Sequence, residues 1–523
     1  MNPSRLPEHV EGYGPVRAFD GVRPPPDVVS RAAVRTTPCA SGRDKLLPDI
    51  DAVFAACNIR DGATLSFHHH LRNGDQLLNQ VLAVAARRGL RDLTIAASSI
   101  FPVHAPLVEH MRTGVVRRLT TAYMSGPVAE AVSRGVLATP AVMTTHGGRA
   151  RAIEAGEVHI DAAFIAAPAA DRHGNASGAE GRAACGPLGY AMVDARHAER
   201  VIVVTDELRV APPTPLDIHQ DDVDFVVRID SIGDPAGILS GTTRPTTEPV
   251  GLRIAEAAAD VISASGLLRE GFSFQTGAGG VSIAAAMFVR ERMLRDGVVG
   301  SFCAGGVTAA QVAMLDEGLF SNLYDVQCFD PKAVDSYRRD PRHLAMSASM
   351  YANPNSRGPL VERLDAMLLG AAEVDLDFNV NVTTGSDGLI LGGSGGHADT
   401  AAGAKLAIVT TRLTAGGRPK IVERTRCLTT PGATIDAVVT EVGVAVHPSR
   451  QELRDRLLRA GMDVVTIEGL LARARALVPE GIEGPPEDSA RVVAVVEYRD
   501  GRVTDVVRST PSRRSMVRVG LSQ

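Results

Sequence analysis

Residues 374–400 read VDLDFNVNVTTGSDGLILGGSGGHADT, and this segment carries the clearest fold signal in the chain. It predicts an extended run at 376–382, a glycine loop at 392–396 and a helix that starts near Thr400. Glycine loses more backbone entropy on folding than any other residue, so such a loop is expected where the chain turns tightly or lies against a ligand. Its bare N–H groups suit an oxygen that carries negative charge. A plain surface turn is the alternative interpretation.

Outward from this segment, the sequence alternates between strand and helix patterns. Residues 63–67 and 93–97 read as strands, and the helix between them has its apolar face at 77–85. Strands that alternate with helices of about ten residues predict a parallel sheet covered on both faces.

The same plan occurs twice along the chain. Three pairs of segments match in order: 62–89 with 271–297, 104–114 with 308–318, and 185–205 with 392–411. The chain is therefore predicted to be a tandem duplication of one α/β domain, although the ordinary rhythm of α/β folds is an alternative source of the match. The predicted division is an N-terminal arm at 1–45, a first domain at 46–240 and a second domain at 241–523.

Local signals near the C-terminus predict the last elements. Ser449 and Glu452 form an S-x-x-E capping box for a helix closed by Gly461. Asp500 and Gly501 form a hairpin turn between two apolar strands.

Composition limits the classes of function. Of the 523 residues 45% are apolar and 22% charged, as in an ordinary globular protein. A formal net charge of -5 without a basic cluster argues against nucleic acid or an anionic membrane surface as the main partner. The sequence contains no apolar run long enough to span a membrane, and its first residues lack the apolar core of a signal peptide. A cytoplasmic protein is expected.

The cysteines and histidines do not predict a metal site. The six cysteines are scattered without a CxxC pair and are expected to be reduced, with Cys303 more suited to packing than to nucleophilic catalysis. His68, His69 and His70 are consecutive, and neighbouring side chains of an extended segment point to opposite faces, so the three cannot bind one ion without a sharp turn. One or two of them suit an anion in the domain cleft, and a structural role is the alternative.

Three glycine-rich loops of the second half, at 275–280, 304–306 and 392–396, are expected beyond the carboxyl ends of parallel strands, where ligands bind. The first loop lacks the glycine spacing and the acidic residue of a dinucleotide site, and the chain has no phosphate-binding P-loop and no HExxH helix. In the first half, the 146–149 segment HGGR combines a histidine, two bare amides and a guanidinium, a set that suits a carboxylate. An exposed turn is the alternative there.

Several longer motifs, taken in order, resemble the alpha subunit of bacterial citrate lyase from about residue 45 onward. The matching runs are SFHH at 66–69, HAPLVEH at 104–110, HGGR at 146–149, FNVNV at 378–382, GSDG at 385–388 and SGGH at 394–397. More distantly, residues 275–280, 393–399 and 440–445 resemble the CoA-transferase superfamily. This resemblance implies two tandem, topologically similar CoA-transferase-like α/β domains with mainly parallel sheets.

The resemblance also implies an activity and its partners. The chain would be a citrate CoA-transferase that replaces acetate with citrate on the phosphopantetheine or dephospho-CoA-type thioester arm of a gamma carrier subunit, with no cofactor of its own bound covalently. A beta subunit would then cleave the citryl group, and the alpha chain would form a homo-oligomer within the larger complex. Many CoA transferases carry a nucleophilic glutamate where this chain has residues 303–306, which contain none. Direct attack of a citrate carboxylate, through a mixed anhydride, is therefore expected.

Under this reading the candidate residues fall into three groups. The oxyanion and catalytic candidates are Gly393, Gly395, Gly396 and His397; the citrate candidates are His68, His69, His146 and Arg149; the thioester candidates are Gln275, Gly277, Gly279, Gly280, Asn379 and Asn381. Glu441 is a candidate covalent group, although support of the neighbouring strand is the preferred role. Two other functions stay open: a non-catalytic scaffold for the carrier and lyase subunits, and a free-standing transferase that uses soluble acyl-CoA.

Overall fold

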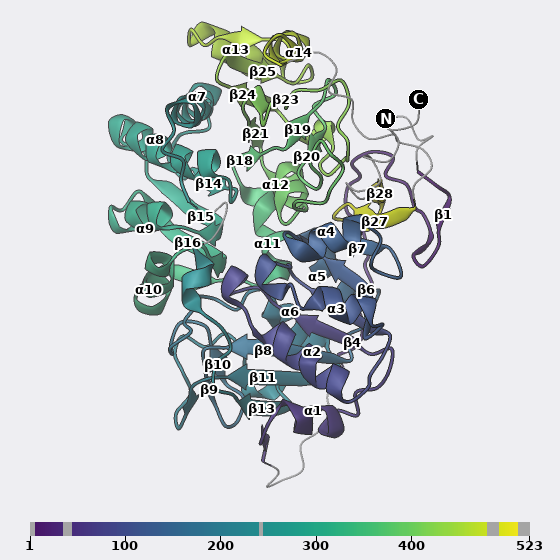
Figure 1. Ribbon diagram of the computed structural model, residues 1–523. Helices are drawn as coiled ribbons and strands as arrows, with labels where there is room; N and C mark the ends of the chain where they lie inside the picture. The colour runs from purple at the N-terminus through teal and green to yellow at the C-terminus, as the bar shows by residue number, and fades with distance from the viewer. Residues whose placement is uncertain (1–5, 35–43, 240–243, 479–490, 511–523) are drawn as a thin grey trace, which may run out of the picture.

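The computed structural model describes residues 6–34, 44–239, 244–478 and 491–510, and it contains two large sheets with helices packed on them (Figure 1). The first sheet runs in the order β28 (Val503–Arg508), β27 (Val492–Glu497), β7 (Ala141–Met143), β6 (Val116–Thr121), β5 (Leu93–Ala97), β4 (Thr64–Phe67), β8 (Ala162–Ala167), β11 (Val201–Thr205), β13 (Phe225–Arg228) and β3 (Leu46–Leu47). The second runs β17 (His343–Ala345), β16 (Phe320–Cys328), β15 (Gly300–Val307), β14 (Ser273–Thr276), β18 (Ala366–Gly370), β21 (Leu406–Thr410), β24 (Ala437–Thr440), β25 (Gly443–Val446) and β26 (Val464–Val465).

The two sheets share one topology. In each, the seven central strands lie in the order fourth, third, second, first, fifth, sixth and seventh along the chain, from β7 to β13 and from β17 to β24. All the pairings among these strands are parallel. The predicted duplication and the predicted fold class are therefore confirmed, whereas the predicted boundary near residue 240 lies outside the described residues.

The helices bury their apolar faces against the sheets. On α2 the side chains of Leu78, Val81 and Leu82 are at most 1% exposed, as the apolar spacing predicts. The helices associated with the first sheet are α1 (Ile50–Ala56), α2 (Leu77–Arg87), α3 (Leu107–Arg112), α4 (Pro127–Ser133), α5 (His146–Glu154) and α6 (Ala191–His197). Those of the second half are α7 (Pro249–Ser265), α8 (Gly280–Asp296), α9 (Ala309–Asp316), α10 (Pro331–Arg339), α11 (Ala348–Ala352), α12 (His397–Gly403), α13 (Gln451–Arg459) and α14 (Ile467–Ala476).

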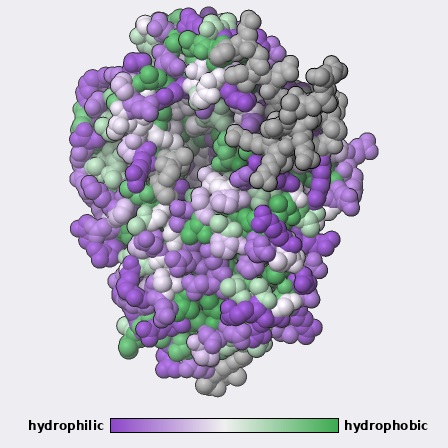
Figure 2. All heavy atoms as spheres, in the orientation of Figure 1, coloured by the Kyte–Doolittle hydropathy of each residue, from purple (hydrophilic) through white to green (hydrophobic). Residues whose placement is uncertain are grey.

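Short strands complete the described structure. The small sheets contain β1 (His9–Val10), β2 (Gly14–Pro15), β9 (Ala169–Asp171), β10 (Ala176–Ser177), β12 (Leu208–Arg209), β19 (Glu373–Val374), β20 (Val380–Asn381), β22 (Thr414–Ala415) and β23 (Arg418–Pro419). Within the described parts of the chain, none of the helices combines the length and the hydropathy that crossing a bilayer requires. Hydrophilic residues dominate the face seen in Figure 2, and hydrophobic ones are interspersed among them.

The C-terminal hairpin corrects the predicted division of the chain. The turn at Asp500 and Gly501 forms as predicted, but β27 pairs in parallel with β7, so the hairpin extends the first sheet rather than the second domain. The apolar residues of β27 are buried there, because they continue the surface that β7 begins. In the N-terminal arm, β1 lies beside the same hairpin (Figure 1). Val10 of this strand packs with Val495 and Val503.

Three local predictions are wrong for identifiable reasons. The run at 376–382 forms a strand only at Val380–Asn381 (β20), because the Asp375 carboxylate accepts the N–H groups of Asp377 and Asn379 and holds the first part of the run in a turn. The α12 helix begins at His397, three residues before the predicted start. The predicted capping box does not form, since Ser449 lies before the N-cap of α13 and its hydroxyl contacts the His447 ring instead.

We predict that a chain ending at Val478 unfolds more easily than one ending at Thr510. The shorter chain lacks the hairpin, so it exposes the edge of β7 and loses buried valines, each of which stabilises the fold by about 1.5–3 kcal/mol. Thermal unfolding of the two truncated proteins beside the full chain measures the difference. Equal unfolding temperatures for all three would show that the first sheet does not need the hairpin.

Candidate active site

The glycine loop of the second half docks on the first sheet. The Gly395 N–H donates to the Ala122 carbonyl at 3.0 Å, and the Gly395 carbonyl accepts the N–H of His146 at 2.8 Å. The loop thus lies at the carboxyl ends of β6 and β7, which is where ligands bind in parallel sheets. Glycine is required at position 393, because a Cβ there would lie 2.5 Å from the Ala122 carbonyl oxygen.

A carboxylate next to this loop joins the two halves. Asp399, on α12, accepts the Thr145 hydroxyl at 2.8 Å and the Gly147 N–H at 2.9 Å, so it binds the N-terminus of α5. An acid is favourable at a helix N-terminus, where N–H groups lack intrahelical partners. Asp399 is fully buried, and burial raises its pKa to about 6. Arg499, 3.7 Å away, opposes that rise.

Three aromatic rings pack together beside the docked loop. His69, His146 and Tyr190 lie with ring centroids 4.5–5.7 Å apart, and the His69 ring nitrogen Nδ1 is 2.6 Å from the Ser98 hydroxyl. Burial, with help from nearby charges, lowers the pKa of both histidines, that of His146 to about 3. The two imidazoles are therefore neutral and act as hydrogen-bonding groups rather than cations. His146 Nδ1 is buried without a partner in the described structure.

The second half supplies a facing pair of side chains. The Gln275 side-chain amide donates to the Tyr351 hydroxyl at 2.7 Å, and a Cβ at Gly396 would lie 2.5 Å from that same hydroxyl. At the other end of the pair, a Cβ at Gly305 would lie 2.4 Å from the Gln275 amide nitrogen. Gly305 also has a φ of +102°, which side chains rarely adopt. Gln275 therefore fills the space that a side chain at position 305 would need.

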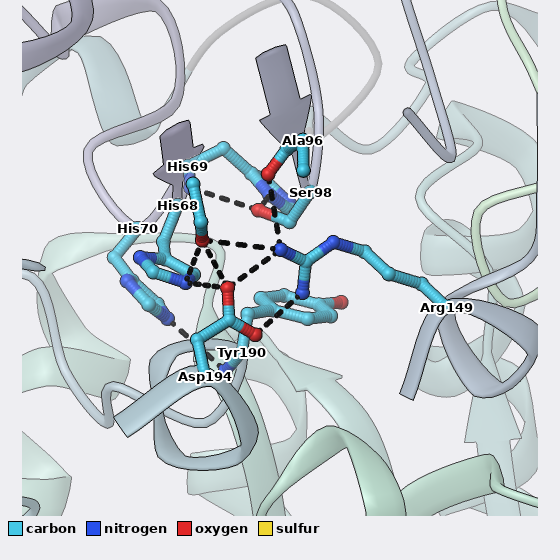
Figure 3. A network of polar contacts seen from close by, with 9 residues as sticks. His68, His69, His70, Ala96, Ser98, Arg149, Tyr190 and Asp194 are labelled. Carbon is cyan, nitrogen blue, oxygen red and sulfur yellow. Dashed lines mark hydrogen bonds and ion pairs between the residues drawn. The ribbon is translucent and has the colours of Figure 1, made fainter. Parts of the chain in front are cut away.

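Two of the predicted citrate ligands, His68 and Arg149, have a carboxylate partner within the protein, because Asp194 binds both (Figure 3). The Arg149 guanidinium donates to the two Asp194 carboxylate oxygens at 2.8 and 2.6 Å, and His68 Nε2 lies 2.8 Å from the second. Burial alone would raise the pKa of Asp194, but Arg149 and then His68 hold it well below its ordinary value. This buried ion network fixes α5 and α6 to the first sheet.

Other candidates also have structural partners. His397 is held at both ring nitrogens, by the Thr430 hydroxyl at 2.7 Å and the Gly370 carbonyl at 2.9 Å, so it is not placed for catalysis. Burial lowers its pKa to about 4. The Gly395 N–H is not an oxyanion donor, since it donates to Ala122. The Gly277 N–H likewise donates to the Leu368 carbonyl at 2.7 Å.

The remaining thioester candidates serve local folding. The amide of Asn379 donates to Asp375 and that of Asn381 to Glu373, which fixes the turn before the glycine loop. Gly279 and Gly280 form the N-cap and first residue of α8. Outside this set, Glu441 accepts the Leu413 N–H, as the supporting role predicts. Cys303 is fully buried, and burial raises the pKa of its thiol, which suits packing.

The sequence reasoning missed Arg72, Tyr190 and Tyr351. Arg72 follows the three histidines and is 7% exposed, and its guanidinium lies 4.9 Å from the Phe101 ring centroid and 5.0 Å from that of Phe329. Its position two residues after His70 was the available signal. The two tyrosines carry no local sequence signal, because only the docking of the two halves brings them together.

Two groups of potential metal ligands occur among the described residues, and one of them is buried in the second half. Donor atoms of Asp325, Cys328 and His343 all fall within 4.8 Å of one another and are buried. Asp325 is 3.1 Å from both partners and also accepts the N–H groups of Val307 and Gln327. Hydrogen bonding accounts for this arrangement, and it supports the bulge between Gly305 and Gly306 in β15.

Comparisons with known proteins agree on one family. The family model for "Citrate lyase, alpha subunit" matches residues 43–510. The citrate lyase alpha chain of Escherichia coli (strain K12) is 48% identical over 463 residues, 88% of this chain and 90% of that protein. The corresponding chain of Klebsiella pneumoniae is 43% identical over 489 residues, 94% of this chain and 96% of that protein.

The chain is also similar to solved structures. A crystal structure from Streptococcus mutans, assigned as an alpha subunit of citrate lyase and solved in complex with citrate, superposes with a TM-score of 0.92 at 43% identity, covering 97% of this chain and 99% of that one. A Pseudomonas malonate decarboxylase hetero-tetramer contains a chain with a TM-score of 0.62 at 18% identity, covering 85% of this chain and 86% of that one. At that identity the second likeness shows the fold alone.

We predict that Arg149→Met lowers the free energy of unfolding by about 3–5 kcal/mol, because it leaves the buried Asp194 carboxylate without its cation. Chemical denaturation measures this loss. The double variant Arg149→Met, Asp194→Leu is the control and should recover part of it, since no unpaired charge remains. A stable Arg149→Met protein with weakened citrate binding would instead support the citrate role predicted from the sequence.

Asp399 predicts a pH dependence of stability. Its pKa is raised from 3.8 to about 6 in the folded chain, so its contribution is complete below about pH 3.8 and is lost as the pH rises through 6. Asp399→Asn keeps a neutral acceptor for the Gly147 N–H. Between pH 5 and pH 7 the native chain should therefore lose about 1–3 kcal/mol more than the variant. Parallel denaturation curves at the two pH values measure this, and equal losses would contradict the raised pKa.

Proposed function

Because the chain belongs to the family of citrate lyase alpha subunits, we propose that it transfers the carrier thioester from acetate to citrate. The products are citryl-carrier and free acetate. The 48% identity to the Escherichia coli alpha chain and the citrate in the Streptococcus mutans structure support this assignment of substrate. The carrier would present a phosphopantetheine or dephospho-CoA-type arm on a gamma subunit, with a beta subunit to cleave the citryl product, and the alpha chain would assemble as a homo-oligomer within that complex.

The observation that carries the mechanism is the contact between Gly305 and Gln275. The nucleophilic carboxylate of a covalent transferase would need a side chain at this position, and Gln275 fills that space. The acyl group therefore passes between the substrates directly. A citrate carboxylate attacks the acetyl thioester carbonyl, and the carrier thiolate leaves from the tetrahedral intermediate to give an acetyl-citryl anhydride. The thiolate then attacks the citryl carbonyl of the anhydride, and acetate leaves.

This sequence needs no general base, because the attacking carboxylate and the returning thiolate are both ionised already. Neutral His69 and His146 agree with that requirement, since they can position a substrate without exchanging protons with it. The developing oxyanion needs donors instead. We assign this role to the N–H groups of Gly393 and Gly396, which have no hydrogen-bond acceptor within the described residues. Tyr351, in contact with Gly396, orders that side of the loop.

The function is tested by exchange of labelled acetate with acetyl-carrier and by transfer to citrate. We expect the purified chain to do both and not to split citrate alone. Gly396→Val should reduce transfer at least about a hundredfold, because the new branch meets Tyr351 and blocks the approach to the N–H group. Its thermal unfolding shows whether the variant remains folded.

The mechanism is tested on the same protein. Hydroxylamine or borohydride treatment after incubation with acetyl-carrier should leave every carboxylate unmodified, as judged by mass spectrometry. A stoichiometric label on Glu441 or on another carboxylate would overturn direct attack while leaving the transferase function intact. Absence of transfer with acetyl-carrier, together with activity on acetyl-CoA, would replace the proposal with a free-standing CoA transferase. Inactivity with both would favour a scaffold.

A further inference from the structure

We propose that Arg72 binds a carboxylate of citrate that does not react, and thereby selects polycarboxylates over monocarboxylates. The proposal rests on the proposed function for the identity of the ligand. It concerns a residue that lies beside the packed rings of His69, His146 and Tyr190 but has a different chemical character, because those rings are neutral and Arg72 is a cation.

The first observation is a buried cation without an anion. The Arg72 side chain forms no ion pair with any acid of the described residues, and its Nε atom is buried without an acceptor. The guanidinium packs between Phe101 from the first half and Phe329 from the second. Such contacts compensate only part of the cost of removing a charge from water. A ligand carboxylate would supply the missing partner.

A comparison with Arg149 shows that the missing acidic partner is specific to Arg72. Both arginines are buried near the same histidines, and the positive charge of each lowers the pKa of His146. Arg149 has Asp194 as a built-in carboxylate, with two hydrogen bonds of 2.8 Å or less. The groups that act on the charge of Arg72 are two phenols, Tyr123 and Tyr190, rather than a carboxylate. Burial lowers the pKa of Arg72 to about 10, so it remains charged.

The second observation is that the loop holds Arg72 in a fixed, unfavourable conformation. Its φ of +51° lies in the left-handed region, which is uncommon for residues other than glycine. Each of the next three residues is held by a contact outside the loop. Asn73 accepts the Val103 N–H at 3.0 Å, and Asp75 lies 2.9 Å from His104 Nε2. Gly74 packs so closely on Asp234 that a Cβ would lie 1.8 Å from the Asp234 carbonyl oxygen. Backbone strain that is supported in this way is typical of functional sites.

The geometry gives the selectivity. One carboxylate of citrate must reach the acyl carbon beside the glycine loop, and at least one more must then be accommodated in the same interior. The positive charge of Arg72 lowers the pKa of both His69 and His146, so its guanidinium lies near the two rings. Arg72 can therefore receive the second carboxylate while the neutral rings contact the body of the substrate. Acetate has a single carboxylate and gains nothing from this contact.

The test compares Arg72→Met, Arg72→Lys and the native chain, with Arg112→Met as an exposed control whose side chain is 61% accessible. The first readout is the rise in unfolding temperature that citrate produces in the absence of carrier. We expect this rise to be lost in Arg72→Met, reduced in Arg72→Lys and unchanged in the control. The KM for citrate should increase about tenfold to a hundredfold in Arg72→Met, the range for a charged hydrogen bond, with a smaller change in kcat.

A second readout separates ligand binding from a structural role. Without citrate, Arg72→Met should be at least as stable as the native chain, because it removes an unpaired buried charge. A less stable Arg72→Met protein that keeps its citrate response would overturn the proposal, as would a native chain that citrate does not stabilise. If the native chain binds citrate but transfers no thioester, the proposed function fails and the Arg72 assignment is still decided by the citrate response of the variants.

Discussion

Two backbone hydrogen bonds at Gly395 position the glycine loop of the second half against the histidines of the first half. They connect the glycine loop to Ala122 in one direction and to His146 in the other, so main-chain bonds join the two duplicated halves at this point. Asp399 reinforces the contact from the next helix by binding the start of α5. The stacked histidines of one half and the Gln275–Tyr351 pair of the other are placed by this junction, because each directly adjoins the docked loop.

The interior uses two arginines in opposite ways. Arg149 is neutralised by Asp194 and holds helices to the sheet. Arg72 lies between two aromatic rings and has no acidic partner among the residues that the structure describes. Both are buried, so exposure does not distinguish them, and only their partners do. The free-energy cost of burying the unpaired charge of Arg72 is offset by the rest of the fold, whose strands are largely buried. A paired and an unpaired buried arginine thus lie near the same histidine in one core.

The sequence predicted the architecture better than it predicted the chemistry. Apolar periodicity and glycine punctuation identify strands and helices, and the matching order of segments in the two halves predicted the shared strand order. Roles of polar residues depend on partners that are distant in the chain: Arg149 meets Asp194 across 45 positions, and Gln275 meets Tyr351 across 76. Only Val380–Asn381 of the 376–382 run forms a strand, because hydrogen bonds to the Asp375 carboxylate hold its first residues in a turn despite their strand-like composition. Among the candidates, His69 and His146 lie together, with ring centroids 5.7 Å apart, while their predicted role in binding citrate stays a prediction and Arg72 was not predicted.

The pairing of β27 with β7 determines when the first sheet can be completed during synthesis. A ribosome produces the strands from β4 to β13 early, yet their sheet stays open at the β7 edge until the last residues of the chain emerge. In the meantime the whole second half is translated beside an unpaired, apolar strand, which is the type of edge that recruits foreign strands. The nascent first domain thus has to be protected or delayed for the duration of more than half the chain. Order of synthesis and order of folding differ in this molecule.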